Sequence, residues 1–183
     1  SAEQVKTLLR RNNMSAVKIA DNIYWVGAVD FDSREFHGYE IPYGTTYNAY
    51  LIVDEKITLI DTVKEKFSNT LIQNISEIVD PARIDYVLAN HVEPDHSGGL
   101  DSILDIAKAA QLITCSNGEK GLRAYYHQDW NFKIVKSGDV LNTGRYNLEF
   151  IQTPMVHWPD NMMVYLEDTQ MLFSNDAFGQ HYA

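Results

Sequence analysis

The stretch from Asn90 to Gly99 constrains this chain more than any other part of its sequence. It places four side chains that commonly bind metals, His91, Glu93, Asp95 and His96, within six residues. The apolar segment 84–89 runs directly into it and is predicted to be a buried strand. In a loop after a strand, residues two apart can point the same way, so His91 and Glu93 are predicted to share one metal ion. Asp95 and His96 begin the next turn and are predicted to face a second ion.

Each of these four residues taken alone is better explained as a solvated loop residue beside a helix start, where Asp and Ser commonly cap. When four such residues occur together directly after a buried strand, a metal site becomes the better explanation. The neighbouring residues also fit a compact site. Pro94 stiffens the loop, and Gly98 and Gly99 let the backbone bend tightly and approach a packed centre. A metal site is therefore predicted here.

Two further loops each add one metal-binding side chain just past a predicted strand. His157 lies in a loop bounded by Pro154 and Pro159, and Asp176 follows the apolar run that ends near Ser174. Strand ends are where layered α/β folds present functional groups. Taken singly, His157 or Asp176 is better explained as a turn residue. Together with the first cluster, they are predicted to complete the site.

The apolar pattern along the chain mixes strands with helices, without an internal repeat or a linker. Strands are expected as a hairpin over 17–29 and at 47–53, 57–61, 84–89, 111–115, 132–136, 147–153, 162–167 and 170–174. Helices are expected at 67–79, where Pro81 ends the pattern, and at 100–107 and 118–126. Consecutive hairpins alternate with strand–helix units, which predicts an α/β layered fold with sheets faced by helices.

The composition limits the setting of the protein. At 183 residues the chain suits one domain, and its net charge of −10 argues against nucleic acid or an anionic membrane surface as the main partner. No apolar run is long enough for a transmembrane helix, and the single Cys115 excludes an internal disulfide. A cytoplasmic location is expected. Residues 1–13 are polar, so we expect an N-terminal extension or vector-derived residues there and one domain over 14–183.

The order of these ligands resembles that of the metallo-β-lactamase superfamily. His-x-Glu-x-Asp-His is followed by His157, 157 − 96 = 61 positions after His96, and by Asp176, 176 − 157 = 19 positions later. Hydrolases of that superfamily usually carry His where this chain has Glu93. Glu at that place is similar to flavodiiron proteins, as are four further motifs. These are Phe-His-Gly (36–38), Gly-Thr-Thr-Tyr-Asn (44–48), His-Trp-Pro-Asp (157–160) and Ser-Asn-Asp-Ala-Phe-Gly-Gln-His-Tyr (174–182). The match runs from about Val17 to the last residue.

This resemblance implies an αββα sandwich with a diiron centre between the sheet edges. It assigns His91, Glu93 and His157 to the iron nearer the flavin, Asp95 and His96 to the other iron, and Asp176 to a bridge between them. Carboxylate ligands such as Glu93 suit iron, whereas an imidazole-rich site suits zinc at least as well. Asp160 and Asn90 are, by position only, candidates to hold the imidazoles in place.

The activity that the resemblance implies is reduction of dioxygen to water or of nitric oxide to nitrous oxide. FMN in a flavodoxin-like domain would supply electrons across a head-to-tail homodimer, and rubredoxin or a similar carrier would reduce the flavin. His37, Tyr47 and Trp158 are expected near the pocket for the diatomic substrate. For Tyr47 and Trp158, packing in the core is the favoured alternative.

The family also places one more His ligand well beyond the bridging Asp, and the chain stops at Ala183. A sandwich incomplete at its C-terminal end is therefore expected, without the flavin domain. By itself this piece is predicted to be inactive, with one well-filled metal site, holding iron or zinc, and a poor second one. Two alternatives remain open. One is a zinc-dependent hydrolase of the glyoxalase or lactonase type, against which Glu93 argues, and the other is an inert structural piece.

Overall fold

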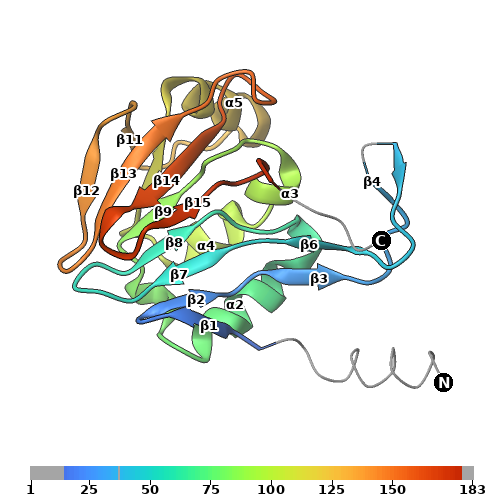
Figure 1. Ribbon diagram of the computed structural model, residues 1–183, viewed down its shortest axis with the longest axis horizontal. Helices are drawn as coiled ribbons and strands as arrows, with labels where there is room; N and C mark the ends of the chain where they lie inside the picture. Colours follow the sequence, from blue (N-terminus) through green and yellow to red (C-terminus); the bar gives the residue numbers. More distant parts are fainter. Residues whose placement is uncertain (1–14, 37, 179–183) are drawn as a thin grey trace.

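The computed structural model describes residues 15–36 and 38–178 and shows two facing sheets with helices against the larger one (Figure 1). The predictions for residues 1–13 and for His37 lie outside these described residues. The larger sheet has the order β1-β2-β7-β8-β9-β10-β11 and the smaller one β12-β13-β14-β15. The larger sheet comprises β1 (Val17–Ala20), β2 (Ile23–Trp25), β7 (Tyr50–Ile52), β8 (Thr58–Ile60), β9 (Tyr86–Leu88), β10 (Gln111–Thr114) and β11 (Phe132–Ile134). The smaller comprises β12 (Val140–Asn142), β13 (Asn147–Gln152), β14 (Met162–Leu166) and β15 (Met171–Phe173).

The central strands of the larger sheet are buried on both faces, because neighbouring residues of a strand point to opposite sides. Leu59 and Leu51 face a cluster that also contains residues of the helices, whereas Ile60 and Ile52 face a second cluster shared with the smaller sheet. This is why these strands read as continuous apolar runs rather than as an alternating pattern. The α/β layered fold predicted from the sequence is confirmed.

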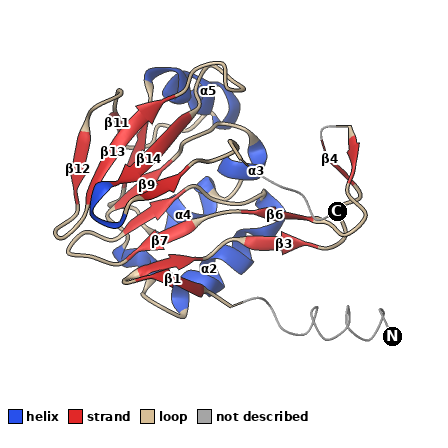
Figure 2. Ribbon diagram, in the orientation of Figure 1, coloured by secondary structure: helices blue, strands red, loops and turns tan. Residues whose placement is uncertain are grey.

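Three helices lie on one side of the larger sheet, as Figure 2 shows in blue. They are α2 (Ser68–Ser76), α4 (Leu100–Ile106) and α5 (Ser116–Tyr126). Leu71 of α2 and Leu104 of α4 belong to the first cluster, so each helix buries its apolar stripe against the sheet. Helix α2 ends at Ser76, before Pro81, which instead begins the short 3₁₀ helix η2 (Pro81–Arg83).

Strands β8, β9, β10 and β11 run parallel to one another, so their carboxyl ends meet at one edge. The predicted hairpins are confirmed, because β1 pairs with β2 and β7 with β8 in antiparallel register. Several elements were not predicted as the structure has them. They include β12, the hairpin β4 (Glu35–Phe36) with β5 (Tyr39–Glu40), the pair β3 (Ala28–Asp30) with β6 (Thr45–Tyr47), and the short helix α3 (Pro94–Ser97).

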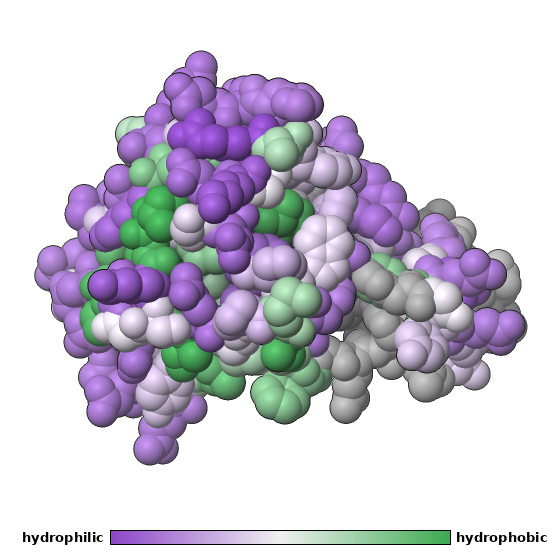
Figure 3. Space-filling model, turned by 90° about the horizontal axis from the view of Figure 1, so that it is seen from above, coloured by the Kyte–Doolittle hydropathy of each residue, from purple (hydrophilic) through white to green (hydrophobic). Residues whose placement is uncertain are grey.

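The surface seen from above is mostly hydrophilic, with hydrophobic residues in separate patches (Figure 3). Within the part of the chain that is described, no helix has the length and apolar character needed to cross a membrane. The remaining short elements are η1 (Glu65–Phe67) and η3 (Glu167–Thr169). Helix η3 connects β14 to β15.

Candidate metal centre

The six side chains predicted as ligands lie together at the carboxyl edge of the larger sheet. His91, Glu93, His157 and Asp176 each offer one ligand atom, and these atoms lie within 4.8 Å of one another. Asp95, His96 and Asp176 form a second group under the same limit. Asp176 therefore belongs to both groups, which is the arrangement expected for two neighbouring cations.

The first loop brings four of these side chains to the edge directly after β9. His91 follows the strand, and Glu93 is the N-cap residue of α3, which begins at Pro94. Proline suits this first helical position because its missing N–H would have no intrahelical partner there. The segment predicted as a loop is thus partly helical, and α3 carries Asp95 and His96.

Gly98 allows this helix to pack against the neighbouring segment 63–65. A Cβ atom at Gly98 would lie 2.5 Å from the backbone nitrogen of Glu65 and 2.5 Å from the carbonyl oxygen of Pro94. Thr62 adds hydrogen bonds from its backbone N–H and its hydroxyl to the His96 carbonyl, at 2.8 and 2.7 Å. The ligand loop is therefore fixed to the chain that follows β8.

Asp176 presents one carboxylate oxygen to each group. Its Oδ1 lies 2.6 Å from His96 Nε2, and its Oδ2 lies 2.9 Å from His157 Nε2 and 3.6 Å from His91 Nε2. Glu93 Oε2 lies 3.2 Å from His91 Nε2 and 3.3 Å from His157 Nε2. Three imidazoles and three carboxylates therefore converge on one small volume.

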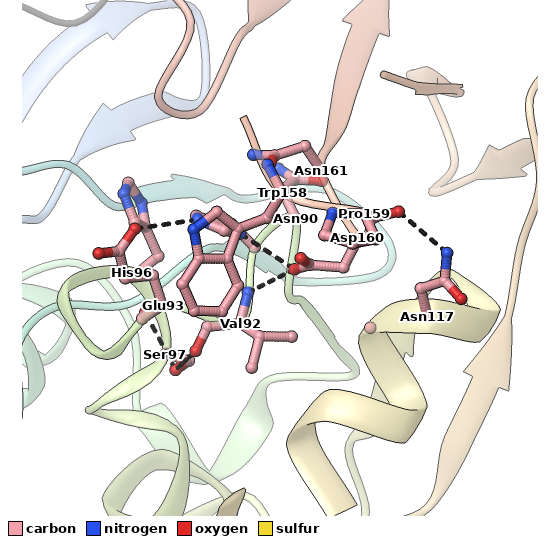
Figure 4. A network of polar contacts seen from close by, with 12 residues as sticks. Asn90, Val92, Glu93, His96, Ser97, Asn117, Trp158, Pro159, Asp160 and Asn161 are labelled. Atoms are coloured by element: carbon pink, nitrogen blue, oxygen red, sulfur yellow. Dashed lines mark hydrogen bonds and ion pairs between the residues drawn. The ribbon is translucent and has the colours of Figure 1, made fainter. Parts of the chain in front are cut away.

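Asp160 holds the ring of His91 in place, as the sequence suggested by position, and Figure 4 shows its carboxylate directed at Val92. Its Oδ2 lies 3.0 Å from His91 Nδ1 and accepts a hydrogen bond of 2.7 Å from the backbone N–H of Val92. A carboxylate can only accept, so His91 donates its Nδ1 proton to Asp160, and its Nε2 faces the other ligands and can bind a cation once deprotonated. Asn90 does not play the matching role, because its N–H groups donate to Asp61.

Asp61 is a buried residue of the site that the sequence reasoning missed. Its Oδ1 accepts from the backbone N–H of Asn90 at 2.8 Å. Its Oδ2 accepts from the side-chain amides of Asn90 and Asn175, at 3.1 and 3.0 Å. Asn175 in turn accepts a 2.7 Å hydrogen bond from the backbone N–H of Asp176. In the sequence Asp61 is simply the last residue of a predicted strand, and no local signal marks it.

The loop of His157 is anchored from the start of α5. Asn117 donates from its side-chain amide to the carbonyl oxygen of Pro159 at 3.0 Å (Figure 4). The Cys115 thiol donates to the carbonyl oxygen of Asp160 at 3.2 Å. Trp158 stands edge-on to His91, with ring centroids 5.3 Å apart, and is 42% exposed, so it borders the site rather than the core. Tyr47 is buried in the helix-side core cluster, which agrees with the alternative favoured for it.

The charges of these groups depend on one another. Burial acts to lower the pKa of His96, but hydrogen bonds and charges from Asp176 and Asp95 outweigh it and raise the pKa well above its usual value. Burial likewise acts to lower the pKa of His91, and Asp160 raises it overall. Burial acts to raise the pKa of Asp176, yet His96, His91 and His157 hold it well below its usual range.

We expect metal affinity to rise with pH. The raised His91 and His96 pKa values mean that pairing with carboxylates stabilises the metal-free fold below pH 6.5 and that this stabilisation is lost as pH rises through the raised values. The lowered Asp176 pKa contributes stability above pH 3.8 that is lost as pH falls through the lowered value. A metal must displace the imidazole protons, so affinity should rise about tenfold per pH unit for each proton displaced. Competition titrations with a chelator across this range measure it, and a pH-independent affinity would contradict the expectation.

Removing Asp160 is expected to weaken metal binding. Asp160→Ala should lower metal affinity by roughly 10- to 100-fold, because His91 loses the partner that fixes its tautomer and orientation. Asp160→Asn should retain most of the affinity, since its amide oxygen can still accept from His91 and Val92. Nitrogen NMR of the His91 ring in the metal-free protein reports the tautomer directly. Wild-type affinity and an unchanged tautomer in Asp160→Ala would exclude this role.

Comparison with known proteins gives a consistent result. A family described as "ODP family beta lactamase" matches residues 45–183. The chain is 44% identical over 172 residues to a rubredoxin-oxygen oxidoreductase of Megalodesulfovibrio gigas, covering 93% of this chain and 43% of that protein. It is 46% identical over 170 residues to a nitric oxide reductase of Moorella thermoacetica, covering 91% of this chain and 43% of that protein.

Solved structures show the same likeness. The rubredoxin oxygen:oxidoreductase from Desulfovibrio gigas matches with a TM-score of 0.89 at 43% identity, covering 92% of this chain and 43% of that one. The flavodiiron protein from Giardia intestinalis matches with a TM-score of 0.88 at 36% identity, covering 93% of this chain and 42% of that one. The chain thus spans less than half the length of these relatives.

Proposed function

Since the chain belongs to the ODP family of β-lactamase-like domains, we propose that it is the diiron domain of a flavodiiron oxidoreductase. The reaction would be reduction of dioxygen to water, of nitric oxide to nitrous oxide, or of both. Relatives named for each reaction are similar to this chain at 44% and 46% identity. The observation that carries the proposal is the carboxylate of Asp176, which faces both candidate ligand groups.

The donor atoms of the chain fit iron. His91, His157, Glu93 and Asp176 would hold one ion, and Asp95 and His96 would hold the second with Asp176 as the bridge. Mixed imidazole and carboxylate donors are typical of non-haem iron sites, whereas softer thiolate donors select copper(I), zinc or iron–sulfur clusters. The side chain of His91 is 0% exposed and those of Asp95 and His96 are 10% exposed, whereas that of His157 is 47% exposed. Solvent and substrate would therefore approach from the side of His157.

When bound, a pair of ferrous ions would supply electrons and open coordination positions to a diatomic substrate. The residues of this chain would hold the metal ligands in position. Asp160 directs His91 Nε2 towards the centre, Thr62 fixes the helix that carries Asp95 and His96, and Asn175 fixes the loop that carries Asp176. Such positioning lets the centre accept substrate without rearranging its ligands.

The whole protein would need partners that these residues do not supply. Following the relatives, we propose FMN as the immediate electron donor, a rubredoxin-type carrier upstream of it, and a head-to-tail homodimer. Iron analysis of the anaerobically purified whole protein tests the proposal, together with dioxygen and nitric oxide consumption driven by reduced rubredoxin. Two irons per chain and consumption of either gas are expected. Ester or lactone hydrolysis with zinc alone would instead indicate a hydrolase.

A further inference from the structure

The backbone of Lys64 is fixed against the helix that carries two of the candidate ligands. Lys64 lies between Val63 and Glu65, the residues that pack on Gly98 of the α3 turn. The Thr62 hydroxyl accepts from the backbone N–H of Gly99 at 3.1 Å, which ties the same segment to the end of α3 a second time. The position of the Lys64 backbone beside α3 is therefore set by its neighbours in the chain, so it should not change when the Lys64 side chain is substituted.

The ammonium group of Lys64 lies over two aromatic rings. It is 5.5 Å from the ring centroid of Phe36 and 5.6 Å from that of Tyr47, distances at which a cation is attracted to a ring face. Tyr47 is itself held by a 3.1 Å hydrogen bond to Asp30 and by packing on the ring of Phe67. No ion pair joins Lys64 to a carboxylate of the described residues. Its charge is thus placed by aromatic contacts and not by an ion pair.

A cavity of about 270 Å³ joins this ammonium to the candidate metal ligands. Its lining is Glu35, Phe36, Lys64, Glu93, Pro94 and Asp95. Glu93 belongs to the first ligand group and Asp95 to the second, so the cavity reaches both. The volume holds several waters or one small ion, given that a water occupies about 30 Å³.

The charge balance of the loaded site favours an anion in this cavity. Glu35, Glu93, Asp95 and Asp176 carry four negative charges, and two divalent ions would carry four positive ones. Lys64 adds a further positive charge at the cavity wall. Resting on the proposed function, we propose that Lys64 makes this cavity an anion-binding subsite, which takes small inorganic monoanions beside the metal pair. The same preorganised charge would favour a diatomic substrate as it becomes negative on reduction.

Azide binding to the cobalt(II)-loaded whole protein tests the subsite, because the visible spectrum of cobalt reports the anion. Lys64→Met retains the aliphatic stem between the rings and removes the charge. It should weaken azide by about tenfold, the effect of one unit charge several ångströms away in a partly screened site. Lys64→Arg should stay close to wild type. Lys108→Met removes the same charge from an exposed lysine ahead of β10, at the opposite edge of the sheet, and should leave azide binding unchanged.

A variant that removes a negative charge distinguishes an effect of charge on azide binding from a general disturbance of the site. Glu35→Gln removes a negative charge from the same cavity wall and should tighten azide, whereas a general disturbance of the site would weaken it. Equal azide affinity in Lys64→Met and wild type, at equal cobalt content, would overturn the subsite while leaving the metal site intact. If the wild type bound no pair of divalent ions, the proposed function would fail and the subsite with it.

Discussion

Asp176→Ala is expected to abolish binding of the metal pair. The change removes the one carboxylate that faces both ligand groups, with Oδ1 at 2.6 Å from His96 and Oδ2 at 2.9 Å from His157. Loss of an outer partner of a ligand costs roughly 10- to 100-fold in metal affinity, and loss of a shared ligand should cost more than that range. We expect at most one ion per chain, weakly held. Titration with ferrous iron under anaerobic conditions, followed by metal analysis, measures the stoichiometry.

A control variant and an NMR titration test whether the loss of metal binding comes from Asp176 itself. Asp168→Ala is the control, because it removes an exposed carboxylate ahead of β15, whereas Asp176 lies after that strand. The Asp168→Ala protein should still bind two ions. In the metal-free Asp176→Ala protein, the His96 pKa should move down towards its usual value, because one of the two carboxylates that raise it is gone. NMR titration of the His96 ring follows this shift. Two tightly bound ions in Asp176→Ala would show that Asp176 is not shared between the groups.

The sequence was sufficient for the features of this site that are local. His91, Glu93, Asp95 and His96 follow a single buried strand, so their proximity is largely fixed by the chain itself. His157 and Asp176 could be added because each follows a strand, and in the structure their loops meet the first one. Spacing assigned His91 and Glu93 to one ion and Asp95 and His96 to a second, and the family resemblance added His157 to the first ion and Asp176 as the bridge.

What could not be predicted depends on contacts between distant segments. Asp61 bonds to Asn90 across 29 positions and to Asn175 across 114, and hydrophobic periodicity reports only neighbours along the chain. The α3 helix was missed for a different reason. Its four residues are polar and begin with Pro94, so the pattern resembles a loop. Lys64 was overlooked because its position depends on the packing of Gly98 and on two rings from other strands.

Asp61→Ala is expected to be the most destabilising change near the site. Asp61 is 3% exposed, and its carboxylate accepts hydrogen bonds from Asn90 and Asn175 that join the first ligand loop to the last. Alanine would leave these buried donors without a partner, and it would also occupy a left-handed backbone position, φ 56°, that suits Asp or Asn better. A loss of about 3–5 kcal/mol in the free energy of unfolding is expected, from roughly 1–3 kcal/mol for each buried donor left unpaired and about 1–2 kcal/mol for the left-handed backbone. Denaturant unfolding of the metal-free protein measures it.

Asp61→Asn and Asp54→Ala distinguish the local role of Asp61 from a general loss of stability. Asparagine suits the left-handed backbone and keeps one acceptor oxygen, and it removes a charge whose burial raises the Asp61 pKa, so its cost should be about 1–3 kcal/mol. Asp54 accepts four hydrogen bonds, from Glu55, Thr143, Arg145 and Tyr146, but lies in the β7–β8 turn, away from the ligands. Asp54→Ala should therefore lower stability without changing metal affinity. Asp61→Ala should lower both, because Asn175 no longer holds Asp176 in place. Unchanged metal affinity in Asp61→Ala would mean that the two loops meet without this buried carboxylate.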